Sequence, residues 1–252
     1  MLKIYGVPNS QPVRAVVWAC LIKALPFEFV MTSQNKAAKA PEYLSRVNPR
    51  GTIPAIDDDG VVLWESHAIL IYLAEKHGWS DLWPDDLVKR AAVNQYLHFH
   101  HRNTRELVIQ WSRALWPSVF GVQNPDEAWI KRNTFPGLQN NAQVVEQALQ
   151  IINGMLAEHD YLTGPNLTLA DISAYEELGQ NQAKYANCTD YSLFPNIERW
   201  LALMEALPYH AQAHAVWALI GNIDEIKGGM AAIAGANKEA AKIYTAAVAD
   251  YA

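Results

Sequence analysis

The sequence predicts a small α/β domain followed by a larger domain built almost wholly from helices. Strand and helix patterns alternate over the first part of the chain, strand patterns nearly vanish after it, and a segment rich in turn formers and tryptophan separates the two. We place the α/β domain at residues 1–79, a linker at 80–86 and the helical domain at 87–252, with a C-terminal extension from about residue 221. A single mixed domain is the alternative.

The first domain is expected to run strand, helix, strand, helix, hairpin, helix. Pro12 falls in the first turn of the first helix, where a proline is tolerated. The aspartate and glycine residues at 57–60 are typical of a hairpin turn. Ser66 is a suitable N-cap for the last helix, and Gly78 a suitable C-terminal cap. The expected elements are strands Leu2–Tyr5, Phe27–Met31, Thr52–Ile56 and Val61–Trp64, and helices Gln11–Leu25, Pro41–Val47 and Ser66–Gly78.

The second domain is expected to consist of long helices. Thr168 and Asp171 have the spacing of a capping box, in which each side chain binds the other residue's backbone amide. The expected helices are Leu87–Ser112, Asp126–Ala157, Thr168–Tyr185, Pro195–Leu207 and an alanine-rich stretch near Lys238–Asp250.

Composition excludes several classes of protein. The 252 residues carry a net charge of −6, with 8 basic and 7 acidic residues before position 80 and 12 and 19 after it. This distribution lacks the concentrated basic face of a nucleic-acid-binding protein, and it makes the first domain the better place for an anion. The longest apolar run, Ala15–Ile22, is too short to span a membrane, and the N-terminus does not resemble a signal peptide. We therefore expect a cytoplasmic protein with no membrane partner, in which Cys20 and Cys188 are free thiols.

Three features of the first domain point to one kind of ligand. Ser10 lies at the start of a helix that follows a strand, where free amides and the helix dipole favour an anion. Glu65 and Ser66 lie at a second such junction, where a carboxylate and a hydroxyl together suit an amino-acid head group. A cis proline at Ile53-Pro54 would leave the Ile53 backbone free for an extended peptide. Each feature also has a purely structural interpretation, as an ordinary helix cap, a solvated carboxylate or an edge-strand proline.

The motifs resemble those of a known family. The chain carries Ser-Gln-Pro-x-Arg at residues 10–14, Asn-Pro at 48–49 followed by Ile-Pro at 53–54, Glu-Ser-x-Ala-Ile-Leu-x-Tyr-Leu at 65–73, and the capping pair at 168 and 171. In this combination the chain resembles the cytosolic glutathione transferases, most closely the theta class, over about residues 2–215. The resemblance implies a thioredoxin-like N-terminal domain, an all-helical C-terminal domain and a homodimer.

The resemblance also implies an activity: transfer of glutathione, bound as co-substrate, to a hydrophobic small-molecule electrophile. Ser10 would hold the glutathione thiol as a thiolate, with Tyr5, inside the first strand, as the competing donor. Lys36 is a second candidate beside Lys39 for the glycine carboxylate. The alternative is a non-catalytic binding or interaction module on the same fold, such as a ligand carrier. The residues expected to bind glutathione are Ser10, Gln11, Lys39, Thr52, Ile53, Pro54, Glu65 and Ser66.

The second domain is expected to hold the electrophile. Arg102 and Arg105 fall on its first expected helix, and Arg105 is the preferred candidate for stabilising a leaving group. Trp111 and Trp116 are candidates for the pocket wall, although tryptophans at helical spacing are often core residues. The histidines at 98, 100, 101, 210 and 214 lack the further ligands of a helical zinc site, so no metal is expected. The extension after residue 221 is expected to cover part of the pocket.

Overall fold

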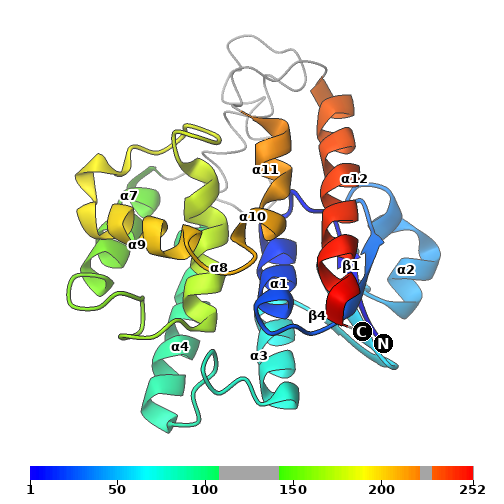
Figure 1. Cartoon of the computed structure of the whole chain (residues 1–252), viewed down its shortest axis with the longest axis horizontal. Coiled ribbons are helices and arrows are strands. Elements are labelled where there is room, and N and C mark those ends of the chain that lie inside the picture. The colour runs from blue at the N-terminus through cyan, green and yellow to red at the C-terminus, as the bar shows by residue number, and fades with distance from the viewer. Residues whose placement is uncertain (108–141, 222–228, 252) are drawn as a thin grey trace. The chain divides into compact units, whose positions relative to one another are not determined.

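The computed structural model describes residues 1–107, 142–221 and 229–251 (Figure 1). The strands are β1 (Leu2–Gly6), β2 (Phe27–Met31), β3 (Ala55–Asp58) and β4 (Val61–Trp64). The α-helices are α1 (Gln11–Ile22), α2 (Pro41–Arg46), α3 (Ser66–His77), α4 (Leu87–His100), α7 (Ala142–Met155), α8 (Leu169–Leu178), α9 (Pro195–Glu205), α10 (His210–Ala213), α11 (Ala215–Ile220) and α12 (Gly229–Val248). Short 3₁₀ helices are η1 (Ala37–Lys39), η2 (Thr104–Glu106), η3 (Gly179–Asn181), η4 (Tyr191–Leu193) and η6 (Ala249–Tyr251). Among these described residues, no helix is both long and apolar enough to cross a membrane.

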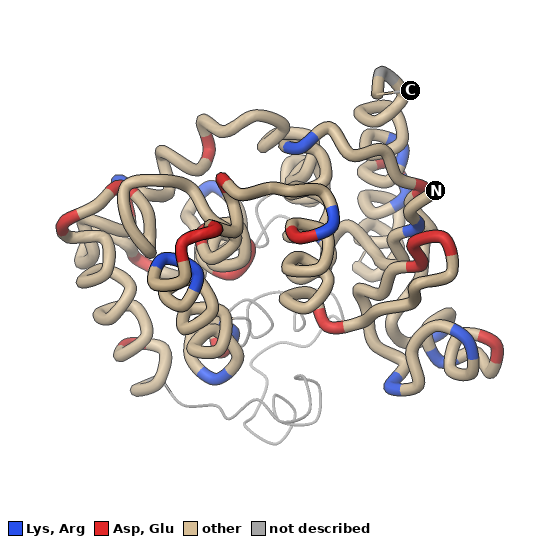
Figure 2. The backbone as a smooth tube through the Cα atoms, turned by 90° about the horizontal axis from the view of Figure 1, so that it is seen from below, with Lys and Arg blue, Asp and Glu red and all other residues tan. Residues whose placement is uncertain are grey.

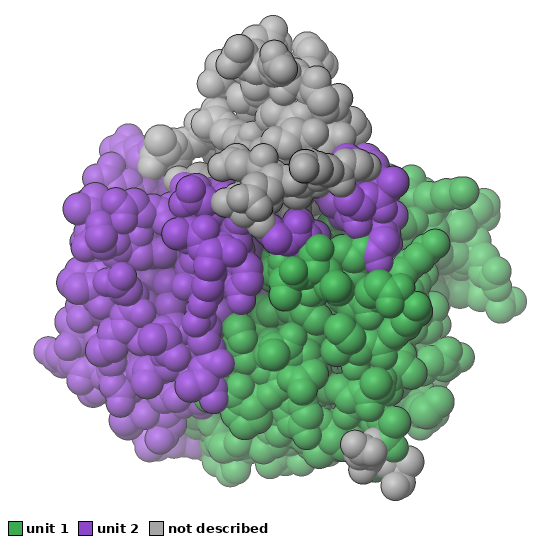
Figure 3. Space-filling model, turned by 45° about the horizontal axis from the view of Figure 1, so that its top comes forward, with its two compact units in different colours: residues 1–85, 207–219, 236–252 green, residues 86–206, 220–235 purple. Residues whose placement is uncertain are grey.

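The chain divides into two compact units, which Figure 3 colours separately. Unit 1 contains residues 1–85, 207–219 and 236–252, and unit 2 contains residues 86–206 and 220–235. Two C-terminal segments therefore group with the N-terminal α/β part of the chain rather than with the helices that precede them in sequence.

Unit 1 is built on a four-stranded sheet in the order β2-β1-β3-β4. β1 and β2 are parallel, whereas β3 is antiparallel to both of its neighbours. Helices α1 and α3 pack side by side on one face of this sheet. Gly6 allows α1 to come close, because a Cβ atom at this position would lie 2.5 Å from a methyl group of Val13. The sheet and the two helices form the thioredoxin-like arrangement that the sequence predicts.

The C-terminal segments complete the core of unit 1. Trp18 of α1 is fully buried, and its ring nitrogen donates to the carbonyl oxygen of Pro208 at 3.0 Å. The ring of Tyr244 on α12 packs edge-on against Phe29 of β2, with 5.1 Å between the ring centroids. The Tyr251 hydroxyl donates to the carbonyl of Leu21 at the end of α1. These contacts tie 207–219 and 236–251 to the α/β part of the chain.

Unit 2 is all helical over its described residues, as the sequence predicts. The buried carboxylate of Asp171 joins several of its segments. Asp171 is fully buried at the start of α8 and accepts from the backbone amide and hydroxyl of Thr168, both at 3.0 Å. It also accepts from the Leu162 amide at 2.8 Å and the Trp200 ring nitrogen at 3.1 Å. The expected capping box is present, and its carboxylate also joins α8 to the preceding loop and to α9.

Two details of the expected hairpin are wrong. β3 begins at Ala55 instead of Thr52, because pairing with β1 starts at Tyr5 opposite Ala55 and Pro54 has no N–H to extend it. The strands also run on to Asp58 and Val61, which pair with each other, so the turn contains only Asp59 and Gly60. Both turn residues have positive φ, 49° and 94°, as a two-residue hairpin requires.

Several expected helices have different ends. α4 ends at His100 instead of Ser112, because the Asn103 side chain donates to the Phe99 carbonyl at 2.9 Å and ends the helical pattern. Arg102 and Arg105 therefore do not lie on this helix. α8 ends at Leu178 instead of Tyr185. α12 begins at Gly229, well before the expected Lys238, and the short helices α10 and α11 were not expected. Of the expected helix Asp126–Ala157, the part before residue 142 lies outside the described residues.

Replacing Asp171 with alanine should destabilise the protein strongly. The change leaves four buried donors without an acceptor, so we expect the free energy of unfolding to fall by about 3–5 kcal/mol. Asp86 is the matched control, because it accepts two amides at the exposed start of α4 and its replacement by alanine should cost only about 1 kcal/mol. Urea unfolding followed by circular dichroism measures both values. Equal losses in the two variants would contradict the central role of Asp171.

Candidate active site

The strand register brings the three sequence motifs of unit 1 to one edge of the sheet. β1 and β4 run in the same direction, because each is antiparallel to β3. Tyr5 near the end of β1 and Trp64 at the end of β4 both pair with Ala55, the first residue of β3. The loop to Ser10, the junction at Glu65 and the Ile53-Pro54 pair directly before Ala55 therefore meet at this edge.

Ser10 occupies the N-cap position of α1 without capping the helix. Its backbone is extended, with φ −84° and ψ 121°, and its hydroxyl makes no hydrogen bond to the first-turn amides. The first turn contains no acidic residue. The hydroxyl and the helix amides are thus left for a ligand, and the helix dipole adds a partial positive charge there. Gln11, the next residue, is buried.

The loop that leads to Ser10 is held at four backbone positions. The Ser10 amide donates to the Val7 carbonyl at 3.0 Å, and the Arg14 amide donates to the Ser10 carbonyl at 3.0 Å. The guanidinium of Arg14 donates to the Pro8 carbonyl at 3.2 Å. The Asn9 amide donates to Oδ1 of Asn237, on α12, at 2.8 Å. The Ser10 backbone therefore has a defined position before any ligand binds.

Glu65 and Ser66 form the second junction. α3 begins at Ser66 and Glu65 takes the cap position, one residue earlier than expected. Glu65 has a φ of 73°, a conformation that is strained for a residue other than glycine and that is concentrated at functional sites. Its side chain is exposed and does not cap the helix. The first turn of α3 contains no acidic residue, as in α1.

The starts of α4 and α8 differ from these two. Asp86 caps α4 by accepting from the amides of Val88 at 3.0 Å and Lys89 at 2.9 Å. α8 carries the buried capping box of Thr168 and Asp171. In α4 a carboxylate accepts two first-turn amides, and in α8 one accepts the N-cap amide, whereas α1 and α3 have no capping side chain.

The Ile53–Pro54 peptide bond is cis, as expected, and Ile53 lies outside the β3 ladder. Asn48 supports the segment before it, with Nδ2 donating to the carbonyl and the hydroxyl oxygen of Thr52, both at 3.0 Å. Lys39 donates to the Gly51 carbonyl at 2.6 Å. The ammonium of Lys39 therefore lies beside the turn that precedes Ile53.

The segment around Lys39 is the basic part of this site. Residues 36–50 carry four cationic side chains and one carboxylate (Figure 2). Both lysines are exposed, but Lys39 donates to the backbone turn, so Lys39 is the better fixed of the two candidates for a carboxylate.

Tyr5 faces away from α1. Gly6 faces Val13 of α1, and because side chains alternate along a strand, Tyr5 points to the opposite face. There it packs edge-on against Tyr43 of α2, with 6.0 Å between the ring centroids. Burial, followed by the negative charge of Asp57, raises the pKa of its hydroxyl. This environment is that of a packed tyrosine.

In unit 2, Arg105 is paired with a buried carboxylate. It lies next to η2 residues Thr104 and Glu106, and its guanidinium forms an ion pair with Glu177 on α8. Nε2 of His100 lies 3.8 Å from the same carboxylate oxygen. Burial raises the pKa of Glu177, but the Arg105 charge and the contact with His100 outweigh it, so the pKa lies below its ordinary value. Arg105, which the sequence analysis assigns to the substrate, thus has a partner within the protein.

The other expected residues of unit 2 do not join a site in the described structure. Arg102 is exposed beyond the end of α4, and Trp111 and Trp116 lie outside the described residues. His210 and His214, in unit 1, stack on each other and pack against Trp18. Over residues 1–107, 142–221 and 229–251, no group of three or more His, Cys, Asp or Glu residues is placed to hold a metal ion.

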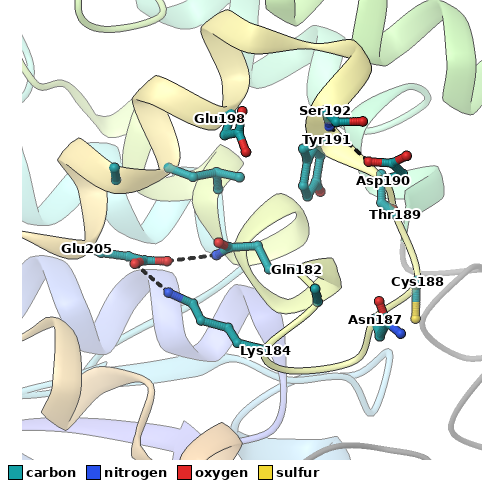
Figure 4. Close-up of a pocket in the computed structure, with 13 residues that line it drawn as sticks. Gln182, Lys184, Asn187, Cys188, Thr189, Asp190, Tyr191, Ser192, Glu198 and Glu205 are labelled. Atoms are coloured by element: carbon teal, nitrogen blue, oxygen red, sulfur yellow. Dashed lines mark hydrogen bonds and ion pairs between the residues drawn. The ribbon is translucent and has the colours of Figure 1, made fainter.

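A cavity of about 620 Å³ lies in unit 2 beside α9 and the segment from Gln182 to Ser192 (Figure 4). Its polar groups are largely paired with one another. Glu205 accepts from Gln182 at 2.8 Å and forms an ion pair with Lys184 at 2.5 Å, as Figure 4 shows. The cavity contains none of the residues expected to bind a ligand.

Sequence reasoning missed two long-range contacts. The asparagine at 237 lies in an alanine-rich stretch, where only its polarity among small apolar residues could have signalled a buried partner. The Glu177 carboxylate lies 72 residues from Arg105, and no local pattern connects the two.

Replacing Glu177 with glutamine should have a pH-dependent effect on stability. A carboxyl whose folded pKa is lowered stabilises the protein above its unfolded pKa of about 4.5, and this contribution is lost as the pH falls through the folded value. We expect a loss of about 2–3 kcal/mol at pH 7.5, less than for a fully enclosed pair because Arg105 retains some solvent contact. Urea unfolding at pH 7.5 and pH 4 measures the difference. Lys242→Gln, which removes an exposed pair with Glu239, is the control, and an equal Glu177→Gln loss at both pH values would contradict the expectation.

Comparisons with known proteins identify the family. A profile of the glutathione S-transferase N-terminal domain matches residues 4–81, and one of the C-terminal domain matches residues 132–208. The chain is 32% identical to glutathione S-transferase theta-1 of Mus musculus over 209 residues, which is 82% of this chain and 83% of the relative. It is 35% identical to glutathione S-transferase theta-2 of the same species over 211 residues, 81% of each chain.

Solved structures agree with these matches. Human glutathione transferase theta-2, determined in complex with glutathione, is 27% identical and superimposes with a TM-score of 0.72 over 96% of this chain and 99% of its own. An epsilon-class glutathione S-transferase from the housefly Musca domestica is 28% identical, with a TM-score of 0.66 over 100% of this chain and 98% of its own. The chain therefore belongs to the glutathione S-transferase family, is similar to its theta class, and is an enzyme that transfers glutathione.

Proposed function

We propose that Ser10 activates the thiol of bound glutathione by donating a hydrogen bond to its thiolate. The observation that carries this proposal is the start of α1, where the Ser10 hydroxyl caps no amide and no acidic residue follows in the first turn. A serine that served only the helix would bind its amides. The competing donor, Tyr5, points to the other face of the sheet and packs against Tyr43.

The energies are of the right size for this role. A cysteine thiol has a pKa near ~8.5, and lowering it by about two pH units takes about 2.7 kcal/mol. A hydrogen bond to a charged group contributes about 1.5–3 kcal/mol, and a helix N-terminus about 0.3–1 kcal/mol more. One hydroxyl at one helix start therefore accounts for a thiolate at neutral pH.

The remaining groups at this edge of the sheet suit the rest of glutathione. The γ-glutamyl ammonium pairs with the exposed Glu65 carboxylate, and the adjacent carboxylate takes the Ser66 hydroxyl and the free amides of α3. The backbone of Ile53, outside the ladder, pairs with the cysteinyl peptide group. Lys39 provides a cation for the glycine carboxylate, next to the turn that Asn48 supports.

The reaction is a deprotonation followed by a displacement that forms one carbon–sulfur bond and breaks the bond to the leaving group. The thiol proton passes to solvent as the thiolate forms, the sulfur donates an electron pair to the electrophilic carbon, and the leaving group departs with the electrons of its own bond. The hydrophobic electrophile belongs to unit 2 in this proposal, with Arg102, Arg105, Trp111 and Trp116 as predicted contacts. A homodimer is the expected assembly.

Replacing Ser10 with alanine should raise the pKa of the bound thiol by about one to two pH units, because the thiolate loses its hydrogen bond. Turnover near pH 6.5 should fall at least ~10-fold, while the Kd for glutathione changes less than about threefold, since the thiol is a small part of the ligand. Thiolate absorbance of the bound complex against pH gives the first value. Ser45→Ala, which removes an exposed hydroxyl on α2, is the control. An unchanged thiol pKa in the Ser10 variant would assign the activation elsewhere.

Replacing Ser66 with alanine should weaken glutathione binding and leave the pKa of the bound thiol nearly unchanged, the opposite of what we expect for Ser10. Loss of one hydrogen bond to a carboxylate should weaken glutathione binding about 10-fold, while the pKa of the bound thiol stays within about 0.3 pH unit of wild type. Isothermal titration calorimetry and the same absorbance titration separate the two effects. If Ser66→Ala shifted the thiol pKa as much as Ser10→Ala does, the distinct roles of the two serines would be wrong.

A further inference from the structure

We infer that Asn237, on the C-terminal helix α12, is a positioning residue that places the Ser10 hydroxyl for thiolate formation. This inference rests on the function proposed for Ser10. It starts from one contact across 228 residues of sequence, in which Oδ1 of Asn237 accepts the backbone amide of Asn9 at 2.8 Å. Asn9 is the residue directly before Ser10.

Asn237 completes the set of anchors on the loop. Three of them are local: the Ser10 amide binds Val7, the Arg14 amide binds the Ser10 carbonyl, and the Arg14 side chain binds Pro8. Asn237 supplies the anchor at Asn9 from a distant segment. The Asn9 amide belongs to the Pro8–Asn9 peptide plane, one Cα atom before the plane that carries Ser10. Movement of this plane is therefore passed on to the Cα of Ser10 and to its hydroxyl.

An asparagine side chain at position 237 suits this role. The buried positions of α12 within unit 1 are Ala236, Asn237, Ala240 and Tyr244, which form one stripe along the helix. A buried side-chain amide is costly unless it is hydrogen-bonded. A backbone N–H can face only the oxygen of an asparagine amide, so the donor at Asn9 fixes the orientation of the Asn237 side chain.

α12 is itself fixed to unit 1 close to this contact. The Tyr244 ring packs edge-on against Phe29 of β2, with 5.1 Å between the ring centroids. Tyr251, just after α12, binds the end of α1 through the Leu21 carbonyl at 3.1 Å. The acceptor at Asn237 is therefore held by a helix with its own attachments to α1 and the sheet, so it can resist movement of the loop.

A small displacement of Ser10 should affect the rate of catalysis more than it affects the stability of the protein. Displacement of a catalytic group by about 1 Å can reduce a rate about 100-fold. Loss of one of several anchors should let the Ser10 hydroxyl move by less than this distance. We therefore expect a reduction in kcat of about 10-fold. The glutathione contacts at Glu65 and Ser66 lie on another loop, so binding should change little.

The test compares two variants that each remove one hydrogen bond of α12. Asn237→Leu keeps the side-chain size but removes the acceptor for Asn9, whereas Tyr244→Phe removes the bond to Ala213 and leaves the loop untouched. We expect Asn237→Leu to raise the pKa of bound glutathione thiol by about 0.5–1 pH unit and to lower kcat about 10-fold. Its Kd for glutathione should stay within about threefold of wild type. Tyr244→Phe should change neither thiol pKa nor kcat, although both variants unfold at lower urea concentration.

The double variant Ser10→Ala/Asn237→Leu shows whether Asn237 acts through Ser10. If it does, Asn237→Leu adds nothing to the thiol pKa once the hydroxyl is gone. A further shift of the same size in the Ser10→Ala background would overturn the inference, as would equal effects of Asn237→Leu and Tyr244→Phe. An unchanged thiol pKa in Ser10→Ala alone would instead overturn the proposed function. The two failures are therefore distinguishable.

Discussion

The guanidinium of Arg14 is the contact on which the active-site loop of unit 1 depends. It is fully buried, donates to the Pro8 carbonyl at 3.2 Å, and lies 4.8 Å from the centre of the Trp217 ring. A charge in this position must be held by acceptors and by an aromatic face, because burial removes its hydration. Arg14 therefore links the loop before Ser10, the first turn of α1 and the C-terminal segment that contains Trp217. The segment that contains Trp217 therefore helps to hold the loop through Arg14.

The strand register determines which other segments lie beside this loop. Because β3 starts opposite Tyr5 and Trp64, the ends of β1 and β4 and the residues before Ala55 share one edge of the sheet. Two helices begin there without a capping side chain, and between them the backbone of Ile53 is free of the ladder. Charged and polar groups of a short peptide suit all three positions. The site is a consequence of sheet topology, with few specialised side chains.

Much of this arrangement was predictable from sequence, because it depends on local rules. The strands at Phe27–Met31 and Val61–Trp64, the C-cap at Gly78, the capping pair of Thr168 and Asp171, and the cis peptide at Pro54 each follow from residues close in sequence. The predictions are wrong where a distant or competing contact determines the end of an element or the partner of a side chain. Asn103 ends α4 early, and pairing with Tyr5 delays the start of β3. The ion pair of Arg105 with Glu177 and the hydrogen bond of Asn9 with Asn237 join residues 72 and 228 positions apart, beyond any local pattern.

The helix starts of α1 and α3 in unit 1 differ from those of α4 and α8 in unit 2. In unit 2, Asp86 accepts two first-turn amides of α4, and Asp171 accepts the N-cap amide of α8, so carboxylates of the protein itself stabilise these two helix starts. In unit 1, α1 and α3 have no capping side chain and no acidic residue in the first turn, and in the proposed function their amides bind glutathione. Such helices need support from elsewhere, and here it comes from the buried contacts of Trp18 with Pro208 and of Tyr244 with Phe29. The C-terminal segments thus contribute to the stability of the unit that contains the candidate site.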